Sequence, residues 1–362
     1  MGKRVVLMGM AGVVCVAGLG GMVFGEESAA VAAKKPVLTL TDAKGGVSRV
    51  AYSPDGKLLA AVSGDGTARV WDAGKGKLLQ TMKGHEGVVI SLAWSADGKQ
   101  LATGGLDKSI NVWNVTTGQI VDRHEQQCPV HGLAIMPDGK HLVSICGEKV
   151  RWWQEGQDEE LFDRPQGDWP LTALALTPEG ELVISDYDGH LAVLDGKTGA
   201  KLAENQVRAE LPATSKDPGG KNWVYSIAPL GKSEAFLTDR VTVWDWNWRE
   251  GTRKRVKATG GYGVAVTPDR EMAVVGGWEE LQVIDVKTQR VVVQPEMKNT
   301  WVTGVSIAPA GDRLAVSSGG HWENAVWTAA GSSVVWVYDL KAAEGVMADQ
   351  RKAAAEKAAG GK

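Results

Sequence analysis

A short turn-forming motif returns about every 41 residues along this 362-residue chain. The interval is 42 residues from Asp55 to Asp97 and 41 residues from Asp97 to Asp138. Seven copies occur, one of them degenerate: Ser53-Pro54-Asp55-Gly56, Ser95-Ala96-Asp97-Gly98, Met136-Pro137-Asp138-Gly139, Thr177-Pro178-Glu179-Gly180, Ala228-Pro229-Leu230-Gly231, Thr267-Pro268-Asp269 and Ala308-Pro309-Ala310-Gly311. A period near 40 residues is typical of repeated supersecondary units, so we expect seven units in one closed body.

Each turn lies between apolar runs of strand length, which predicts an antiparallel hairpin in every unit. A third run ends in an aromatic residue followed by a polar one, as in Val70-Trp71-Asp72, Val112-Trp113-Asn114 and Val243-Trp244-Asp245. A fourth run follows, for example Lys77-Leu78-Leu79-Gln80. Four short strands per unit predict an all-β fold, a seven-bladed β-propeller of four-stranded antiparallel blades.

The second unit carries the most complete motif, with Gly84-His85, Thr103, Asp107 and Trp113. With these residues the chain resembles the WD-repeat (WD40) family, in an exported bacterial form, over about residues 37–340. The resemblance implies that His85, Thr103, Asp107 and Trp113 form a structural hydrogen-bonded relay. In the first unit Ala61 replaces the hydroxyl residue, so the relay is expected in the second blade only.

The ends of the repeat region predict how the ring closes. The last unit stops at its third strand, residues 334–339, whereas Val37-Leu38-Thr39-Leu40 precede the first unit. An N-terminal strand that completes the last blade would remove two exposed sheet edges. We therefore assign the propeller to residues 37–340, after a linker at 26–36 and before an Ala/Lys/Glu-rich tail or frayed helix at 341–362.

The first 25 residues have the pattern of a secretory signal peptide. Lys3 and Arg4 precede an uncharged run at residues 5–24, and small residues stand at the expected cleavage site. The chain is accordingly predicted to be exported, either periplasmic or secreted. An uncleaved membrane anchor at residues 5–24 is the alternative, because about 20 apolar residues can cross a bilayer.

The charge balance argues against nucleic acid as a partner. The formal net charge is -3 at pH 7, and loss of Lys3 and Arg4 with the leader makes it more negative. A membrane is expected as a partner only if the leader stays attached. The propeller is expected to be monomeric.

No constellation of residues predicts an enzyme or a cofactor. The Asp-His-Thr set of the second unit lacks a nucleophile elbow and an oxyanion loop. His124, Cys128 and His131 have zinc-binding residue types, but they straddle a loop and a strand that face different ways, so no metal site is predicted. Cys128 and Cys146 flank one hairpin turn and are candidates for a disulfide.

Tryptophans near the predicted channel mouth are the candidate partner-binding residues. Trp169, Trp223 and Trp301 each come just before an innermost strand, on what the resemblance implies is the upper face. Two insertions, residues 207–221 and 319–331, lengthen loops of the same face, and the second carries His321, Trp322 and Trp327. Packing between blades is the competing interpretation of these tryptophans.

These features favour a non-catalytic scaffold that binds a protein or peptide partner outside the cytoplasm through the upper face. A carbohydrate-binding or glycan-degrading propeller is the alternative, because aromatic side chains also stack on sugar rings.

Overall fold

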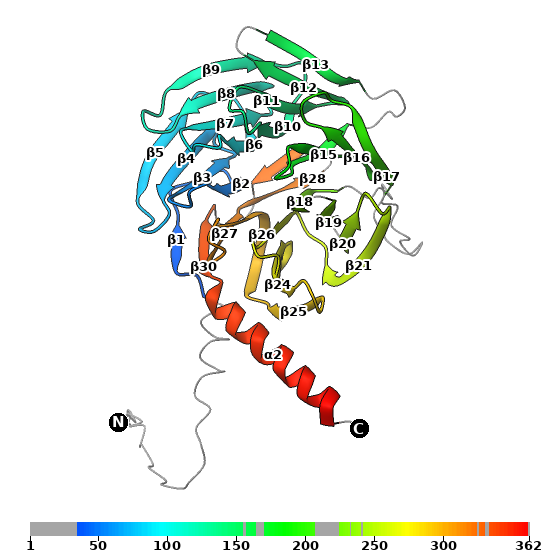
Figure 1. Ribbon diagram of the computed structural model, residues 1–362. Coiled ribbons are helices and arrows are strands. Elements are labelled where there is room, and N and C mark those ends of the chain that lie inside the picture. Colours follow the sequence, from blue (N-terminus) through cyan, green and yellow to red (C-terminus); the bar gives the residue numbers. More distant parts are fainter. Residues whose placement is uncertain are drawn as a thin grey trace, which may run out of the picture.

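The computed structural model describes residues 35–154, 157–163, 170–206, 224–231, 233–239, 242–323, 326–329 and 333–360. Figure 1 shows its sheets arranged around a common centre, with one edge of each sheet facing inward. The predicted all-β architecture of mostly four-stranded antiparallel sheets is confirmed. The predicted leader at residues 1–25 and most of the predicted linker lie outside the described residues.

Five sheets have four strands each, paired in chain order. Their strands are β2 (Val47–Tyr52), β3 (Leu58–Ser63), β4 (Thr67–Asp72) and β5 (Leu78–Lys83); β6 (Val89–Trp94), β7 (Gln100–Gly105), β8 (Ser109–Asn114) and β9 (Ile120–Glu125); β10 (Val130–Ile135), β11 (Leu142–Cys146), β12 (Lys149–Gln154) and β13 (Gln157–Asp163); β14 (Leu171–Leu176), β15 (Glu181–Asp186), β16 (His190–Asp195) and β17 (Lys201–Gln206); β18 (Ser226–Gly231), β19 (Glu234–Thr238), β20 (Thr242–Asn247) and β21 (Thr252–Thr259).

The last two repeat units share one eight-stranded sheet, because β24 and β26 are long enough to pair with each other. Its strands are β22 (Gly263–Val266), β23 (Met272–Gly276), β24 (Trp278–Asp285), β25 (Arg290–Val293), β26 (Glu296–Ile307), β27 (Arg313–Ser318), β30 (Val335–Asp339) and β1 (Leu38–Leu40). A separate hairpin, β28 (Gly320–Glu323) and β29 (Val326–Ala329), lies between β27 and β30 in sequence. β1 pairs antiparallel with β30, with Leu38 opposite Val337.

The innermost strands contact one another in chain order, β2, β6, β10, β14, β18, β22 and β26, and β26 contacts β2. Small hydroxyl side chains bond across several of these seams. Ser48 donates to the Val89 carbonyl, Ser91 to the Val130 carbonyl at 2.8 Å, and Thr303 to the Val47 carbonyl. Because the acceptors are backbone groups of the next strand, these bonds fix the spacing of neighbouring sheets at the centre.

The repeated turn motif forms the hairpin between the first and second strands of a sheet. In the β6–β7 turn, Ser95 and the Lys99 amide both donate to Asp97 Oδ1, at 2.8 and 3.0 Å. Gly98 then adopts a φ of 68°, which glycine tolerates without a Cβ clash. The same turn before β23 has Arg270 at a φ of 63° where the other copies have glycine.

Three tryptophans occupy equivalent positions on the third strands and are fully buried between sheets: Trp71, Trp113 and Trp246. The prediction that Val243-Trp244-Asp245 ends the third strand is therefore wrong by two residues, because Trp246 is the equivalent of Trp113. Trp246 lies opposite Ala235 as Trp113 lies opposite Leu101. Tryptophan recurs at every second residue here, so both placements put an indole on the same sheet face, and the sequence pattern alone does not separate them.

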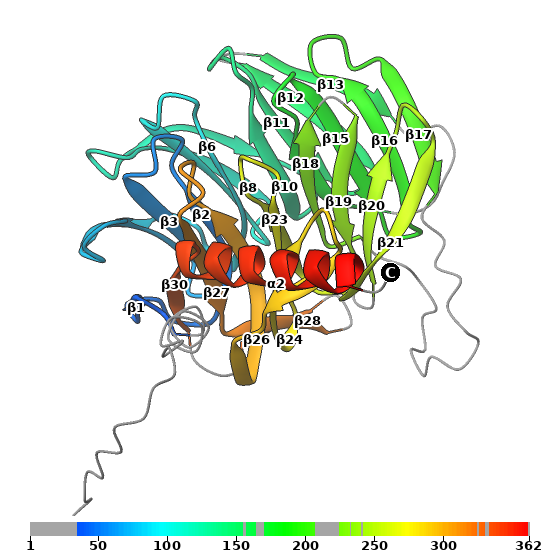
Figure 2. The same ribbon diagram turned by 60° about the horizontal axis from the view of Figure 1, so that its bottom comes forward.

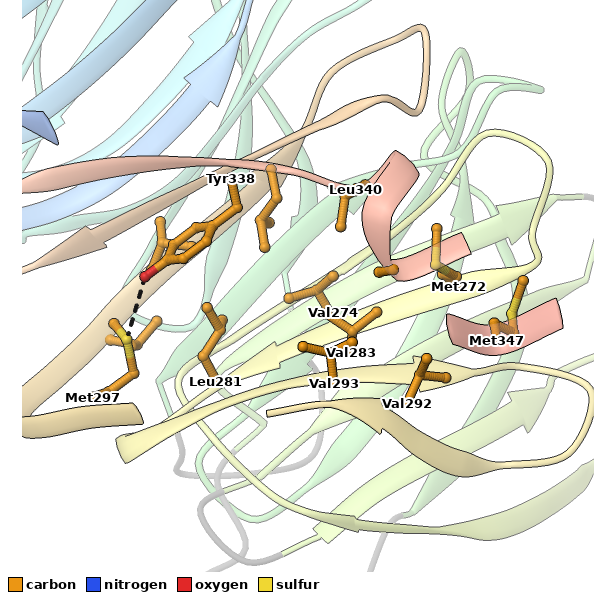
Figure 3. Packing of buried hydrophobic residues seen from close by; sticks show 14 residues of the cluster. Met272, Val274, Leu281, Val283, Val292, Val293, Met297, Tyr338, Leu340 and Met347 are labelled. Atoms are coloured by element: carbon orange, nitrogen blue, oxygen red, sulfur yellow. Dashed lines mark hydrogen bonds between the residues drawn. The ribbon is translucent and has the colours of Figure 1, made fainter. Parts of the chain in front are cut away.

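Residues predicted as a tail or frayed helix form α2 (Lys341–Gly360), which follows β30 and packs against β25 of the eight-stranded sheet (Figures 1 and 2). Ala343 and Met347 are buried in a cluster shared with Met272, Val292 and Tyr338. Figure 3 shows Met347 beside Val292 and the Tyr338 hydroxyl directed at the Met297 sulfur, 3.6 Å away. The helix therefore buries a narrow apolar face although its sequence is mostly Ala, Lys and Glu.

Arg351 of α2 also forms a forked ion pair with the sheet. Its Nε and Nη2 donate to Asp285 at 2.6 and 2.7 Å, and its Nη1 donates to Glu271 at 2.6 Å. The guanidinium hydrogen bonds lower the pKa of Asp285 to about 2. Bidentate pairs of this kind add orientation as well as energy. Among the described residues no helix is both long and apolar enough to span a membrane.

Candidate functional site

The four predicted relay residues of the β6–β9 sheet lie in one hydrogen-bonded chain. Trp113 Nε1 donates to Thr103 Oγ1 at 2.7 Å, and Thr103 Oγ1 lies 2.8 Å from His85 Nε2. His85 Nδ1 is 2.9 Å from Asp107 Oδ2. A neutral imidazole that donates from Nδ1 to the carboxylate accepts the Thr103 hydroxyl proton at Nε2, so every link has one donor and one acceptor.

The surroundings of this chain indicate a structural role. Burial alone would raise the pKa of Asp107, but bonds from His85 and from the Glu86 and Ser109 amides hold that pKa far below its ordinary value. The side chains of His85 and Thr103 are fully buried. The hydroxyl groups that contact His85, those of Thr103 and Ser109, are buried, and Trp113 at the far end of the relay is buried as well.

A second, shorter version occurs in the β10–β13 sheet and was not expected from the sequence. Trp153 Nε1 and Gln126 Nε2 both donate to Ser144 Oγ, at 2.7 and 2.6 Å. Gln126 precedes Ser144 by 18 residues, the same separation as His85 from Thr103. That spacing is the signal that could have found it.

In two other sheets the Nε1 of the equivalent buried tryptophan has a different acceptor or none among the described residues. In the β2–β5 sheet, where Ala61 replaces the hydroxyl, Trp71 Nε1 donates instead to Asp42 at 3.0 Å. In the β18–β21 sheet Leu237 stands where Thr103 stands, and Trp246 Nε1 has no hydrogen-bond partner among the described residues. Among these sheets the relay is complete in β6–β9 and shortened in β10–β13.

Four aromatic side chains form a continuous cluster on the face that carries the loops into the innermost strands, here called the upper face. Tyr225 and Tyr262 have ring centroids 5.0 Å apart, Tyr262 and Trp301 are 5.4 Å apart, and Trp301 and Trp278 are 4.4 Å apart. Trp278 is 45% exposed, while the other three are mostly covered. An amphipathic ring left this open is a typical anchor for a partner.

The local sequence explains why these rings meet. Tyr225 and Tyr262 come just before β18 and β22, and Trp301 lies in β26 just before that strand joins the inner ring. The extended part of β24 places Trp278 opposite Trp301. Figure 2 shows the ends of β24 and β26 projecting from the ring on the same side as β28.

The structure describes only some of the tryptophans predicted to bind a partner. Trp301 belongs to the aromatic cluster, whereas Trp169 and Trp223 lie outside the described residues. In the β28–β29 hairpin, which contacts β26 and β2, Trp322 lies opposite Trp327 and His321 opposite Thr328. The hairpin side chains also lie outside the described part.

The sequence analysis missed Tyr225, Tyr262 and Trp278. For the two tyrosines the available signal was an aromatic residue directly before an innermost strand, the same signal that selected Trp301. Trp278 follows the short second strand of its unit, and its place opposite Trp301 depends on the unusual length of β24 and β26. That pairing joins two repeat units and is not visible in the repeat pattern.

The cysteine and histidine candidates fall into separate surroundings. Cys128 and Cys146 form a disulfide with Cα atoms 5.5 Å apart. His124 pairs with Asp122 on an outer strand, and His131 lines the central channel. No group of three or more potential metal ligands is found in the described part of the chain.

Two segments of the chain, residues 34–72 and 76–114, match the family model described as WD domain, G-beta repeat. The chain therefore carries WD40 repeats. The first segment contains strands β1–β4 and the second contains β5–β8, so each match covers one outer strand and the first three strands of the next sheet.

The chain is also similar to eukaryotic translation initiation factor 3 subunit I of several yeasts. The protein of Scheffersomyces stipitis is 32% identical over 171 residues, 42% of this chain and 49% of that protein. The Candida albicans protein is 29% identical over 178 residues, 44% of this chain and 51% of that protein. The Lodderomyces elongisporus protein is 25% identical over 259 residues, 65% and 72% respectively. The chain thus spans about half the length of the first two relatives.

Proposed function

We propose that this protein is a seven-bladed WD-repeat propeller, closed by β1, that serves as a non-catalytic scaffold for a protein or peptide partner. The unbroken order of contacts among the seven innermost strands supports the ring. The pairing of β1 with β30 supports closure by the N-terminal strand, because it joins the first and last units of the chain.

The aromatic cluster of the upper face carries the binding assignment. Trp278 is among the few large apolar side chains that the described residues expose, and it packs on Trp301, which in turn contacts Tyr262. Rigid aromatic anchors contribute contact area with little loss of conformational freedom on binding. The relatives are by name subunits of a larger factor, which supports a role in assembly.

The scaffold is proposed to act outside the cytoplasm. The sequence of residues 1–25 supports export, and the Cys128–Cys146 disulfide is compatible with an oxidising compartment. Mapping the N-terminus of the mature protein tests this part directly. A start at Glu26 is expected, and a start at Met1 with free thiols would contradict it.

Photo-crosslinking in the native host tests the binding face. A photoreactive phenylalanine analogue replaces Trp278 in one variant and Leu202, a 51% exposed side chain on outer strand β17, in the matched control. We expect one defined protein adduct from position 278 and none from position 202. The same adducts from both positions, or none from 278, would contradict the assignment, and retention on cell-wall glycans lost in Trp278→Ala would assign the cluster to carbohydrate.

A further inference from the structure

The centre of the ring contains a cavity of about 150 Å³ between strands β2, β6, β10, β14 and β18. Its described lining is mostly apolar or hydroxylic, and its ionisable members are Arg49, His131 and Tyr225. No aspartate or glutamate is among these lining residues. The cavity therefore has a cationic group and no carboxylate to balance it.

Arg49 is held by main-chain oxygens only. Its Nη1 donates to the carbonyls of Thr303, at 2.9 Å, and of Ser48, at 3.2 Å. Nε and Nη2 make no hydrogen bond with the described residues, and no carboxylate of those residues forms an ion pair with Arg49. A guanidinium has five N–H donors, so most of its bonding capacity is left for a group in the cavity.

The nearby imidazole does not serve as a counter-charge. Burial and the charge of Arg49 lower the pKa of His131 to about 4, so His131 is neutral at pH 7. Burial also lowers the pKa of Arg49, yet an arginine remains protonated in proteins. By contrast, Arg69 of the same sheet pairs with Asp65 at 2.7 Å. A partly buried cation without a counter-charge costs folding free energy, which a binding role would explain.

We propose that Arg49 binds a carboxylate of the partner, delivered into the central cavity from the upper face. A volume near 150 Å³ is below the roughly 300–1,000 Å³ of ordinary small-molecule pockets, but it admits one acidic side chain or one chain terminus. The planar fork of a guanidinium matches a carboxylate in two-point geometry.

Tyr225 joins this cavity to the aromatic cluster, because it lines the cavity and also contacts Tyr262. A peptide anchored on Trp278 and Trp301 therefore has a continuous path of contacts to Arg49. The inference rests on the proposed function and adds the chemistry of the group that the partner presents.

Thermal unfolding of the full chain with three small probes tests the inference. N-acetylglycine represents a chain terminus, N-acetylglutamate α-amide represents an acidic side chain, and N-acetylglutamine α-amide is the neutral control. At matched ionic strength we expect at least one carboxylate probe, and not the neutral one, to raise the Tm of the wild-type protein. The probe that acts identifies the source of the carboxylate.

Arg49→Met is expected to remove the Tm rise, Arg49→Lys to keep part of it, and Arg123→Met, which removes an exposed arginine of β9, to leave it unchanged. We also expect Arg49→Met to recover the partner about tenfold less efficiently or worse, the loss typical of hydrogen bonds to a charged group. Equal Tm shifts in Arg49→Met and in the wild-type protein, or no Tm rise from either carboxylate probe beyond that of the glutamine probe, would overturn the inference.

The two proposals fail separately. A crosslinked adduct at position 278 without carboxylate binding would overturn the role of Arg49 and keep the scaffold. Carboxylate binding at Arg49 without any adduct would overturn the upper-face scaffold and leave an anion site.

Discussion

The β6–β9 and β18–β21 sheets bury the same indole at the same register position, yet only one of the two indoles has a partner. Trp113 donates to Thr103, which continues to His85 and Asp107. Trp246 packs equally deeply, but Leu237 replaces the acceptor and its Nε1 is unsatisfied among the described residues. The shape of the indole thus keeps the sheets apart in both places, and hydrogen bonding is an addition to that shape.

The difference extends along the chain. The N-terminal sheets use buried polar residues to tie their layers together. The β18–β21 sheet has no such relay among its described residues, and the C-terminal part of the molecule carries the aromatic cluster, the long β24–β26 pair and helix α2. Substitutions of the relay residues in the first region should therefore change stability without changing binding, and substitution of the exposed Trp278 in the second should do the reverse.

The largest effect is expected for Asp107→Ala. It leaves a buried imidazole and the Glu86 and Ser109 amides without their acceptor, so we expect a loss of roughly 3 kcal/mol in the free energy of unfolding. Asp188→Ala, in the corresponding turn between β15 and β16, is the matched control and should cost less than about 1 kcal/mol. Urea unfolding measures both, and equal losses would show that the relay contributes nothing.

Thr103→Val should cost about 2 kcal/mol, because an isosteric methyl removes the acceptor of Trp113 and the partner of His85. Ser144→Ala in the shorter relay leaves the Trp153 and Gln126 donors unpaired and should cost a comparable amount. Denaturant midpoints at constant slope measure the changes, and a neutral Thr103→Val would contradict the relay interpretation.

The C-terminal region should show a different, pH-dependent stabilisation. Arg351→Met is expected to cost about 1.5 kcal/mol at pH 7. Because the folded pKa of Asp285 is depressed to about 2, its contribution is present above the unfolded pKa near 4 and is lost as the pH falls through about 2. The unfolding free energies of the wild-type protein and Arg351→Met should therefore converge as the pH falls from about 4 to about 2. A difference that stays constant with pH would contradict the ion pair.

The smallest expected effect is the contrast between Trp113→Phe and Trp246→Phe. Both changes remove similar volume, but only the second removes a buried donor that has no partner. Trp113→Phe should therefore be the more destabilising by about 1 kcal/mol. The unfolding free energies of the two single variants are compared, and equal costs would contradict the difference in hydrogen bonding between the two indoles.

Much of the fold was predictable because the turn chemistry of Asp97-Gly98 and its equivalents repeats at a fixed interval. The relay followed from the residues of one unit, but its variant at Gln126 and Ser144 uses different residue types in the same positions. Docking of α2 was not predictable, since Arg351 and Met347 are isolated within an Ala-rich segment. The aromatic cluster was found only through Trp301, because its other members meet through pairing between repeat units.

The most direct test of the account is partner recovery by full-length Trp278→Ala and Thr103→Val protein from the native host, at a temperature where circular dichroism shows both folded. We predict that Trp278→Ala no longer recovers the partner identified by crosslinking but keeps its unfolding midpoint. Thr103→Val should recover that partner despite a lower midpoint. Retention of the partner by Trp278→Ala would contradict the assignment of binding to the aromatic cluster.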